Sequence, residues 1–348
     1  PGRGRRFGEG VMTKAMGPRS SGRLESVLRA GHFALTAETS PPDAGGPGPV
    51  LDRAGCLKDL ADAVNVTDGA GARAHMSALA AAAVLARSGV EPVLQLTVRD
   101  RNRMALQGDL LGAAALGIPN VLCLHGDDAR KGDQPDTKPV YDIDSRELMR
   151  TARRMRDEGT LPSGRVIDPR PGLFIGAADL PVDPKPGWKP DGLKERIEAG
   201  ADFVQTQYAF DLTMLRRYLA ALGDHGILDR LYIIVGIGPL ASAKSARWMN
   251  ENLFGVHVPE ALISRLEQAV DQRAEGRRIC VELLRELSEI EGVSGAHLMA
   301  PKQEQAIADV IAECGLLSRR EESANPRRGR SEPRDTAARA IQAMAPAG

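Results

Sequence analysis

The chain has 348 residues, of which 42% are hydrophobic, and its 46 basic and 46 acidic side chains give a formal net charge of zero. That length suits one α/β barrel of about 250 residues with tails, or two domains. A neutral chain gives no electrostatic reason to expect nucleic acid or a membrane surface as a partner. No apolar run approaches the roughly 18 residues that cross a bilayer.

The cysteines and the N-terminal residues indicate the cellular compartment, and the composition of the two terminal segments indicates disorder. Cys56, Cys123, Cys280 and Cys314 lie far apart without CxxC spacing, and the Cys, His and acidic positions suggest no metal site. Arg5-Arg6-Phe7 is not followed by an apolar segment, so no export is expected and a cytoplasmic protein with reduced thiols is predicted. Residues 1–22 are rich in Gly, Arg and Ser, and residues 318–348 hold seven arginines against four acids. Both segments are predicted to be disordered.

From Arg23 the chain alternates between short apolar runs of β type and helical runs. Eight strands are predicted, and most are nearly continuous apolar runs, as in a parallel sheet covered by helices. The predicted strands are Phe33–Thr39, Ala63–Asp68, Pro92–Val98, Asn120–Gly126, Leu173–Leu180, Phe203–Ala209, Leu231–Gly238 and Gly295–Pro301.

Helical patterns separate these strands. The predicted helices are Leu51–Ala61, His75–Ser88, Arg101–Leu116, Ser145–Glu158, Leu193–Ala199, Leu212–Leu222, Ala241–Asn252, Pro259–Val270, Glu275–Glu291 and Gln303–Cys314. Three of them fall between the seventh and eighth strands. Eight βα units predict a (β/α)8 TIM barrel over residues 23–317 with extra helices after strand seven. A doubly wound sheet is the alternative.

The segment Asn120–Ser145 is unusual because a long polar loop follows its buried strand. Loops of this length in a compact domain are usually functional. His125-Gly126-Asp127 ends the strand, and Asp144 or Ser145 can cap the next helix. A carboxylate at the C-terminal end of a barrel strand lies where such folds keep their chemistry.

Glu38 is the most suggestive residue, because it interrupts an otherwise apolar strand near its C-terminal end. Burial favours the neutral form of a carboxyl group, which suits a general acid. The alternative is a structural Glu paired with Arg or Lys. Asp127 could stay ionised and stabilise a cation, or could cap its loop. His125 could equally be a structural residue, and Gly69-Ala-Gly71 alone is a weak ligand signal.

These strand ends, taken in order, resemble the methylenetetrahydrofolate reductase family over about residues 33–317. The motifs that carry the resemblance are Glu38 with Pro41-Pro42, Val64-Asn-Val-Thr67-Asp68-Gly69-Ala70-Gly71, Leu96-Thr97, Gly126-Asp127, Thr206-Gln207 with Phe210-Asp211, and Gly236-Ile237 with Pro239. The segment Gly132–Ser145 is most similar to a subgroup found in acetogens and in fusions with homocysteine methyltransferases.

The resemblance implies flavin-dependent reduction of 5,10-methylenetetrahydrofolate to 5-methyltetrahydrofolate, with Glu38 and Asp127 as catalytic residues and Gln207 contacting the folate. It implies FAD, or FMN, held by the residues Thr67, Gln95, His125, Gly126, Asp127, Tyr141, Ala177 and Arg196. NADH or NADPH is the expected electron donor, and a homo-oligomer is expected.

The chain also departs from the family pattern. Gln95 replaces a common His, His125 replaces an Arg, and Asp68 and Asp179 stand where tyrosines are common. Ala243 and Gln303 replace a Phe and an Arg associated with the nicotinamide and folate sites of some members. Two alternatives therefore stay open: a pterin-binding barrel that transfers a methyl group without redox chemistry, and a flavin-bearing subunit that receives electrons from a partner protein.

Overall fold

The computed structural model of the chain describes residues 17–317. Eight parallel strands form a closed barrel in sequence order, and β8 pairs with β1. The strands are β1 (Ala34–Thr39), β2 (Ala63–Val66), β3 (Pro92–Thr97), β4 (Asn120–Leu124), β5 (Phe174–Asp179), β6 (Phe203–Tyr208), β7 (Tyr232–Ile237) and β8 (Gly295–Leu298). The closed ring confirms the (β/α)8 prediction and excludes the doubly wound alternative, because such a sheet has two free edges.

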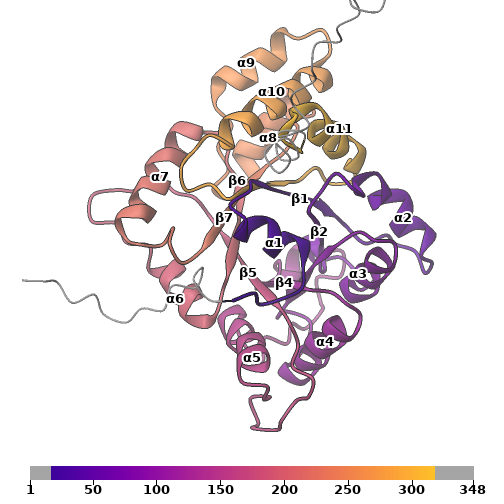
Figure 1. Ribbon diagram of the computed structural model, residues 1–348. Helices are drawn as coiled ribbons and strands as arrows, with labels where there is room; N and C mark the ends of the chain where they lie inside the picture. The colour runs from indigo at the N-terminus through magenta and orange to yellow at the C-terminus, as the bar shows by residue number, and fades with distance from the viewer. Residues whose placement is uncertain (1–16, 318–348) are drawn as a thin grey trace, which may run out of the picture. The chain divides into compact units, whose positions relative to one another are not determined.

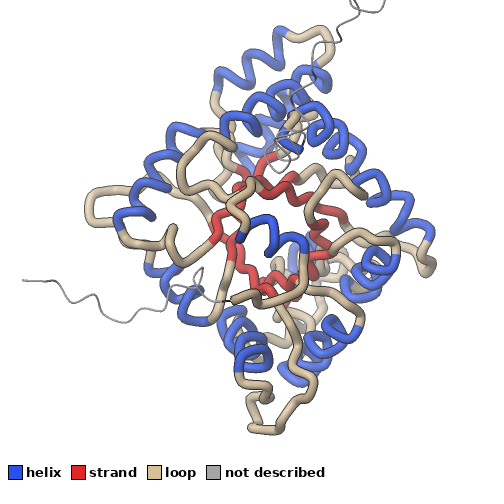
Figure 2. The backbone as a smooth tube through the Cα atoms, viewed as in Figure 1, coloured by secondary structure: helices blue, strands red, loops and turns tan. Residues whose placement is uncertain are grey.

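Helices follow the strands and surround the ring (Figures 1 and 2). The helices are α1 (Arg23–Arg29), α2 (Gly48–Ala54), α3 (Ala78–Arg87), α4 (Arg103–Ala115), α5 (Ser145–Asp157), α6 (Asp191–Ala199), α7 (Leu212–Asp224), α8 (Ala243–Asn252), α9 (Glu260–Gln268), α10 (Gln272–Leu287) and α11 (Glu304–Cys314). Three of them, α8 to α10, lie between β7 and β8, as predicted. Asp144 caps α5 by accepting a hydrogen bond from the Glu147 N–H at 2.7 Å, as its position indicated.

Two predictions near the N-terminus need correction. The helix expected at Leu51–Ala61 begins earlier, at Gly48, because prolines are tolerated in a first helical turn, and it gives way at Gly55 to a 3-10 turn. The disorder expected for residues 1–22 does not extend to Arg19 and Ser20, whose N–H groups donate to the Glu25 carboxylate. Residues 1–16 and the basic segment 318–348 lie outside the described residues, so their predicted disorder and the bounds 23–317 stay predictions.

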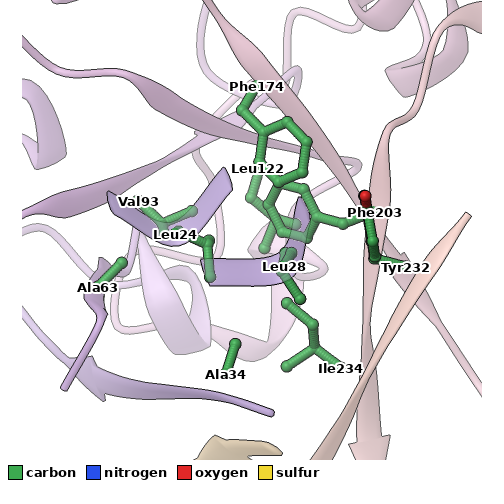
Figure 3. Close-up of a cluster of buried hydrophobic side chains, with 10 residues drawn as sticks. All are labelled: Leu24, Leu28, Ala34, Ala63, Val93, Leu122, Phe174, Phe203, Tyr232 and Ile234. Carbon is green, nitrogen blue, oxygen red and sulfur yellow. The ribbon is translucent and has the colours of Figure 1, made fainter. Parts of the chain in front are cut away.

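Side chains alternate along each strand, and every second one points into the barrel. At the N-terminal end the inward residues are apolar and bury Leu24 and Leu28 of α1 (Figure 3). The strand residues of this cluster are Ala34, Ala63, Val93, Leu122, Phe174, Phe203, Tyr232 and Ile234. Helix α1, absent from the predicted elements, lies across this opening of the ring (Figure 2) and closes it.

Candidate active site

The C-terminal ends of the strands surround a cavity of about 600 Å3, a size typical of small-molecule sites. The inward residues are apolar at the N-terminal end of the strands, whereas many of those at this end are polar. The residues that line the cavity are Glu38, Thr67, Asp68, Ala70, Gln95, Thr97, Leu122, Leu124, His125, Gly126, Asp127, Ala178, Asp179, Leu180, Arg196, Gln205, Thr206, Gln207, Phe254, His297 and Met299.

Glu38 faces this cavity with its side chain 21% exposed. Its Oε2 accepts a hydrogen bond from Gln95 Nε2 at 3.1 Å and lies 3.6 Å from His297 Nε2. Within residues 17–317 it forms no salt bridge with Arg or Lys, so the alternative of a structural Glu–Arg or Glu–Lys pair is not supported. The carboxyl group therefore has polar neighbours while one side stays open to a ligand.

A buried polar network beneath Glu38 holds the His297 ring. The two amide groups of Asn65 and Gln205 are paired, with Asn65 Nδ2 donating to Gln205 Oε1 at 2.6 Å and Gln205 Nε2 donating to Asn65 Oδ1 at 3.0 Å. Thr36 Oγ1 lies 3.0 Å from His297 Nδ1. Because Nδ1 is engaged from below, Nε2 is the ring nitrogen directed at the Glu38 carboxylate.

Asp127 connects the loops that follow β2 and β4. Its Oδ2 accepts a 2.6 Å hydrogen bond from the Gly71 N–H. Arg99, which is buried, donates from Nη1 to the Asp127 carbonyl at 3.0 Å and from Nη2 to the Gly69 carbonyl at 3.3 Å. The hydrogen-bonded Asp100 carboxylate raises the Arg99 pKa, so the guanidinium stays charged. Asp127 thus holds the loop after β2 by a hydrogen bond and also lines the cavity, and its role in stabilising a cation stays a prediction.

His125 and Tyr141 form a stacked pair, with ring centroids 4.5 Å apart and planes inclined by 8°. The long loop after β4 therefore returns over the strand end, and the Val140 N–H donates to the Arg99 carbonyl at 2.7 Å. Tyr141 has a positive φ of 41°, which is rare for a bulky residue and common at functional sites. Tyr141 is thus the stacking partner of His125, a residue for which the sequence left a structural role open.

Gln207 and Asp179 lie on neighbouring strands at the rim. Gln207 Oε1 accepts from the Tyr208 N–H at 3.0 Å, which leaves the amide nitrogen to donate into the cavity. Burial raises the Asp179 pKa, while the Tyr218 hydroxyl, 2.6 Å away, and the charge of Arg196 act to lower it. Arg196 of α6 is thus the cation next to a carboxyl group at this side of the cavity.

The cavity brings together most of the residues expected from the sequence. Those that line it are Glu38, Thr67, Gln95, His125, Gly126, Asp127, Arg196 and Gln207. Tyr141 joins them only through its stack on His125. Ala177 is 1% exposed and does not line this cavity, because the inward positions of β5 are Phe174, Gly176 and Ala178.

Three residues that matter here were not singled out from the sequence. His297 comes next to Glu38 only because β8 closes the barrel against β1. Arg99 follows an apolar strand, the one local signal of its role, and Phe254 lines the rim while 87% exposed. Among residues 17–317 there is no cluster of three or more potential metal ligands. None of the helices in that range is long and apolar enough to cross a membrane.

Comparison with known proteins decides the family. The family description "Methylenetetrahydrofolate reductase" matches residues 23–315, nearly the whole barrel. The chain belongs to the methylenetetrahydrofolate reductase family. The subgroup suggested by Gly132–Ser145 stays a prediction.

Two curated relatives of the chain carry the same family name. It is 25% identical over 260 residues to a probable methylenetetrahydrofolate reductase (NADPH) of Caenorhabditis elegans, and the match covers 72% of this chain and 36% of that protein. It is 26% identical over 266 residues to methylenetetrahydrofolate reductase 2 of Schizosaccharomyces pombe, with 72% of this chain and 40% of that protein covered. The chain thus spans well under half the length of these relatives.

One solved structure with the same fold is an uncharacterized protein from Clostridium thermocellum, described as binding two copies of 5-methyl-5,6,7,8-tetrahydrofolic acid. Its TM-score is 0.55 at 12% identity, and the match covers 84% of this chain and 99% of that one. A likeness at this identity supports the barrel fold.

Proposed function

We propose that the chain reduces 5,10-methylenetetrahydrofolate to 5-methyltetrahydrofolate with a reduced flavin, FAD or alternatively FMN. One observation carries the proposal: the Glu38 carboxyl group lies at the cavity wall between Gln95 and His297, without an Arg or Lys partner among residues 17–317. Family membership supports the substrate and the reaction. A cytoplasmic homo-oligomer is part of the same proposal.

The residues present fit a flavin. The cavity has room for a planar ring system, and the small residues Gly126 and Ala178 let a ring approach the backbone. Gln95 and Thr67 would supply hydrogen bonds to its polar edge, His125 with Tyr141 a flat flank, and Arg196 a charge for phosphate. When bound, the flavin supplies the hydride.

Glu38 would supply the proton. The methylene bridge accepts a hydride readily only after one of its C–N bonds opens to a cation, and opening requires protonation of the leaving nitrogen. The Glu38 carboxyl group would make this transfer from Oε1, because Oε2 accepts the Gln95 hydrogen bond and lies next to His297. His297 Nε2 would hold the carboxyl group in position through the transfer.

Asp127 and Gln207 would act on the folate. Asp127, which accepts the Gly71 N–H, would favour the cationic form of the opened bridge electrostatically. The Gln207 amide nitrogen would donate to an acceptor on the pterin edge. Each side chain is already held by one hydrogen bond, which would lower the cost of ordering it when the substrate binds.

The test is an absorption spectrum of the purified chain followed by anaerobic titration. The proposal predicts a bound flavin that NADH or NADPH bleaches and that 5,10-methylenetetrahydrofolate then reoxidises. Reduction with dithionite separates the folate step from the choice of donor, which matters because the chain covers 36–40% of its relatives. A flavin bleached by dithionite and not by NAD(P)H would favour a partner protein as donor. A colourless protein that binds folate would favour methyl transfer without redox chemistry.

A further inference from the structure

Hydrogen-bond donors and acceptors are distributed unevenly around the cavity. Three polar residues that lie on β3 or directly after β2 line one side of it, namely Thr67, Gln95 and Thr97. All three are buried, with at most 7% of each residue exposed. We call this side the acceptor wall, because each of the three side chains directs its donor group at another residue of the chain.

The side-chain amide of Gln95 is oriented by Glu38. Its Nε2 donates to Glu38 Oε2 at 3.1 Å, and an oxygen that carries no proton can only accept. The amide oxygen Oε1 is then left without a hydrogen-bond partner among residues 17–317. It is absent from the buried unpartnered atoms of that range, so it stays accessible from the cavity. Gln95 therefore offers a ligand an acceptor.

The two threonine hydroxyls of the acceptor wall are engaged in the same way. Thr97 Oγ1 donates to Asp68 Oδ2 at 3.0 Å, and Thr67 Oγ1 donates to Ser40 Oγ at 3.1 Å. Asp68 also accepts the Thr97 N–H at 2.8 Å and forms a salt bridge with Arg101, which balances its charge. The acceptor wall therefore presents oxygen lone pairs to a ligand.

The side of the cavity formed by β6 and α6 has the opposite character. Gln207 Oε1 accepts the Tyr208 N–H, which leaves its amide nitrogen to donate, and Arg196 supplies a guanidinium group. A ligand that satisfies both sides carries an N–H donor on the edge that meets the acceptor wall, and acceptors or negative charge elsewhere.

We propose that Gln95 Oε1 accepts a hydrogen bond from N5 of reduced flavin and so shifts the preference of the site toward the reduced state. The inference rests on the proposed function, which places a flavin in this cavity. The hydride that a flavin receives from NADH or NADPH resides on N5, so reduction changes this nitrogen from an acceptor into an N–H donor. An amide oxygen held by Glu38 matches N5 only in the reduced state, because two acceptors cannot bond to each other.

The experiment measures the midpoint potential of bound FAD in the full-length chain and in Gln95→Leu. Loss of one hydrogen bond predicts that the affinity for reduced FAD falls about three- to tenfold relative to that for oxidised FAD. For a two-electron couple this change lowers the potential by about 15 to 30 mV. Gln134→Leu is the matched control, because Gln134 is exposed and lies outside the cavity lining, and its potential should equal that of the wild type.

A second probe separates the contact with N5 from an indirect effect through Glu38, which also loses a partner in Gln95→Leu. In 5-deaza-FAD a carbon atom replaces N5 and neither donates nor accepts a hydrogen bond. The potential of bound 5-deaza-FAD should therefore be the same in the wild type and in Gln95→Leu. A decrease as large as that seen with FAD would contradict the contact between Gln95 and N5.

The possible results separate this inference from the proposed function. Gln95→Met is close to glutamine in size and should lower the FAD potential in the same direction, so the test survives if Gln95→Leu does not fold. A potential that is unchanged in the folded variants would overturn the inference, while FAD that binds and is reduced would leave the proposed function intact. A wild-type chain that binds FAD in neither oxidation state would overturn both.

Discussion

The two ends of this barrel are built from the same strands and differ in the side chains that point inward from each strand. At the N-terminal end the inward side chains are apolar, and Leu24 and Leu28 of α1 cover them. Charged groups beside that end are paired, as Asp202 is with Arg156 Nη1 at 2.7 Å. On β1 the inward residue at the N-terminal end is Ala34, and four residues further along the strand it is Glu38, which lines the cavity.

The contrast shows how one alternating pattern serves stability and chemistry. The N-terminal end, which α1 closes, is stabilised by apolar side chains that exclude water. At the C-terminal end, where the cavity lies open, polar side chains such as Gln207 keep donors that a ligand can bind. Substitutions at the N-terminal end should therefore change stability and leave ligand binding unchanged, whereas some substitutions at the cavity end should change binding or turnover as well.

Leu28→Ala should have the largest effect on stability. Leu28 is 3% exposed within the apolar cluster, so its truncation should lower the free energy of unfolding by about 2–5 kcal/mol. Denaturant unfolding measures the loss, and flavin affinity below the unfolding transition should stay as in the wild type. A large change in flavin affinity would show that the two ends are not independent.

Gly126→Ala should follow. Gly126 has a φ of +95°, and an added Cβ would lie 3.0 Å from the Arg99 Cβ and 3.2 Å from the Thr97 Cβ. The expected cost is about 1–3 kcal/mol, together with weaker flavin binding because the loop must shift. Gly187→Ala is the control: its φ is +80° with open space around the Cβ, so it tests backbone strain alone. Equal flavin affinity in the two variants would argue against Gly126 as a contact.

Tyr218→Phe should produce a pH-dependent loss. Burial raises the Asp179 pKa and the Tyr218 hydrogen bond lowers it, so removing the hydroxyl should raise that pKa further. A carboxyl group with a raised pKa in the folded state takes up a proton on folding, and stability falls as pH rises through that pKa. The variant should lose about 1 kcal/mol at pH 8 and less at pH 4. Thermal unfolding at the two pH values measures the loss. An equal loss at both would contradict the hydrogen bond from Tyr218 to an ionised Asp179.

Asp142→Asn should have the smallest effect. Hydrogen bonds from Arg103 lower the Asp142 pKa to about 2, so this exposed pair is intact at neutral pH and is lost as pH falls from the ordinary carboxyl range toward that value. The pair anchors the loop next to Tyr141. Hydrogen exchange of residues 140–143 should rise slightly in the variant at pH 7, and the difference from the wild type should shrink as pH falls toward 2. A large change in unfolding midpoint would be unexpected for an exposed pair.

All eight strands could be predicted because buried parallel strands read as apolar runs, and β4 at Asn120–Leu124 is an example. The site could be predicted because polar residues such as Glu38 and Gln207 stand out at the ends of these runs. The resemblance then assigned roles that the pattern alone left open. The predicted strands are one to three residues longer than the observed ones, because neighbouring residues such as Phe33, Val98 and Leu231 continue the apolar run beyond the paired residues.

Other features depend on tertiary contacts that no local pattern reveals. Helix α1 is seven residues long, and its Leu24 and Leu28 are recognised as core residues only once the N-terminal end of the barrel that they cover is known. His297 meets Glu38 only through closure of the ring. The inward phase of β5, which brings Ala178 to the cavity, cannot be read from a run of small residues, and the flavin contact of Ala177 stays a prediction.

The most direct test of the central claim is the rate at which 5,10-methylenetetrahydrofolate reoxidises the reduced flavin in Glu38→Gln. The control is Glu25→Gln, the same chemical change at the closed end, where Glu25 accepts hydrogen bonds from Arg19 and Ser20. Glu38→Gln should keep its flavin and its unfolding midpoint and should react about 10²–10⁴-fold more slowly. Glu25→Gln should unfold more easily and react at the wild-type rate. A Glu38→Gln rate within threefold of the wild type would contradict the role of Glu38 as the proton donor.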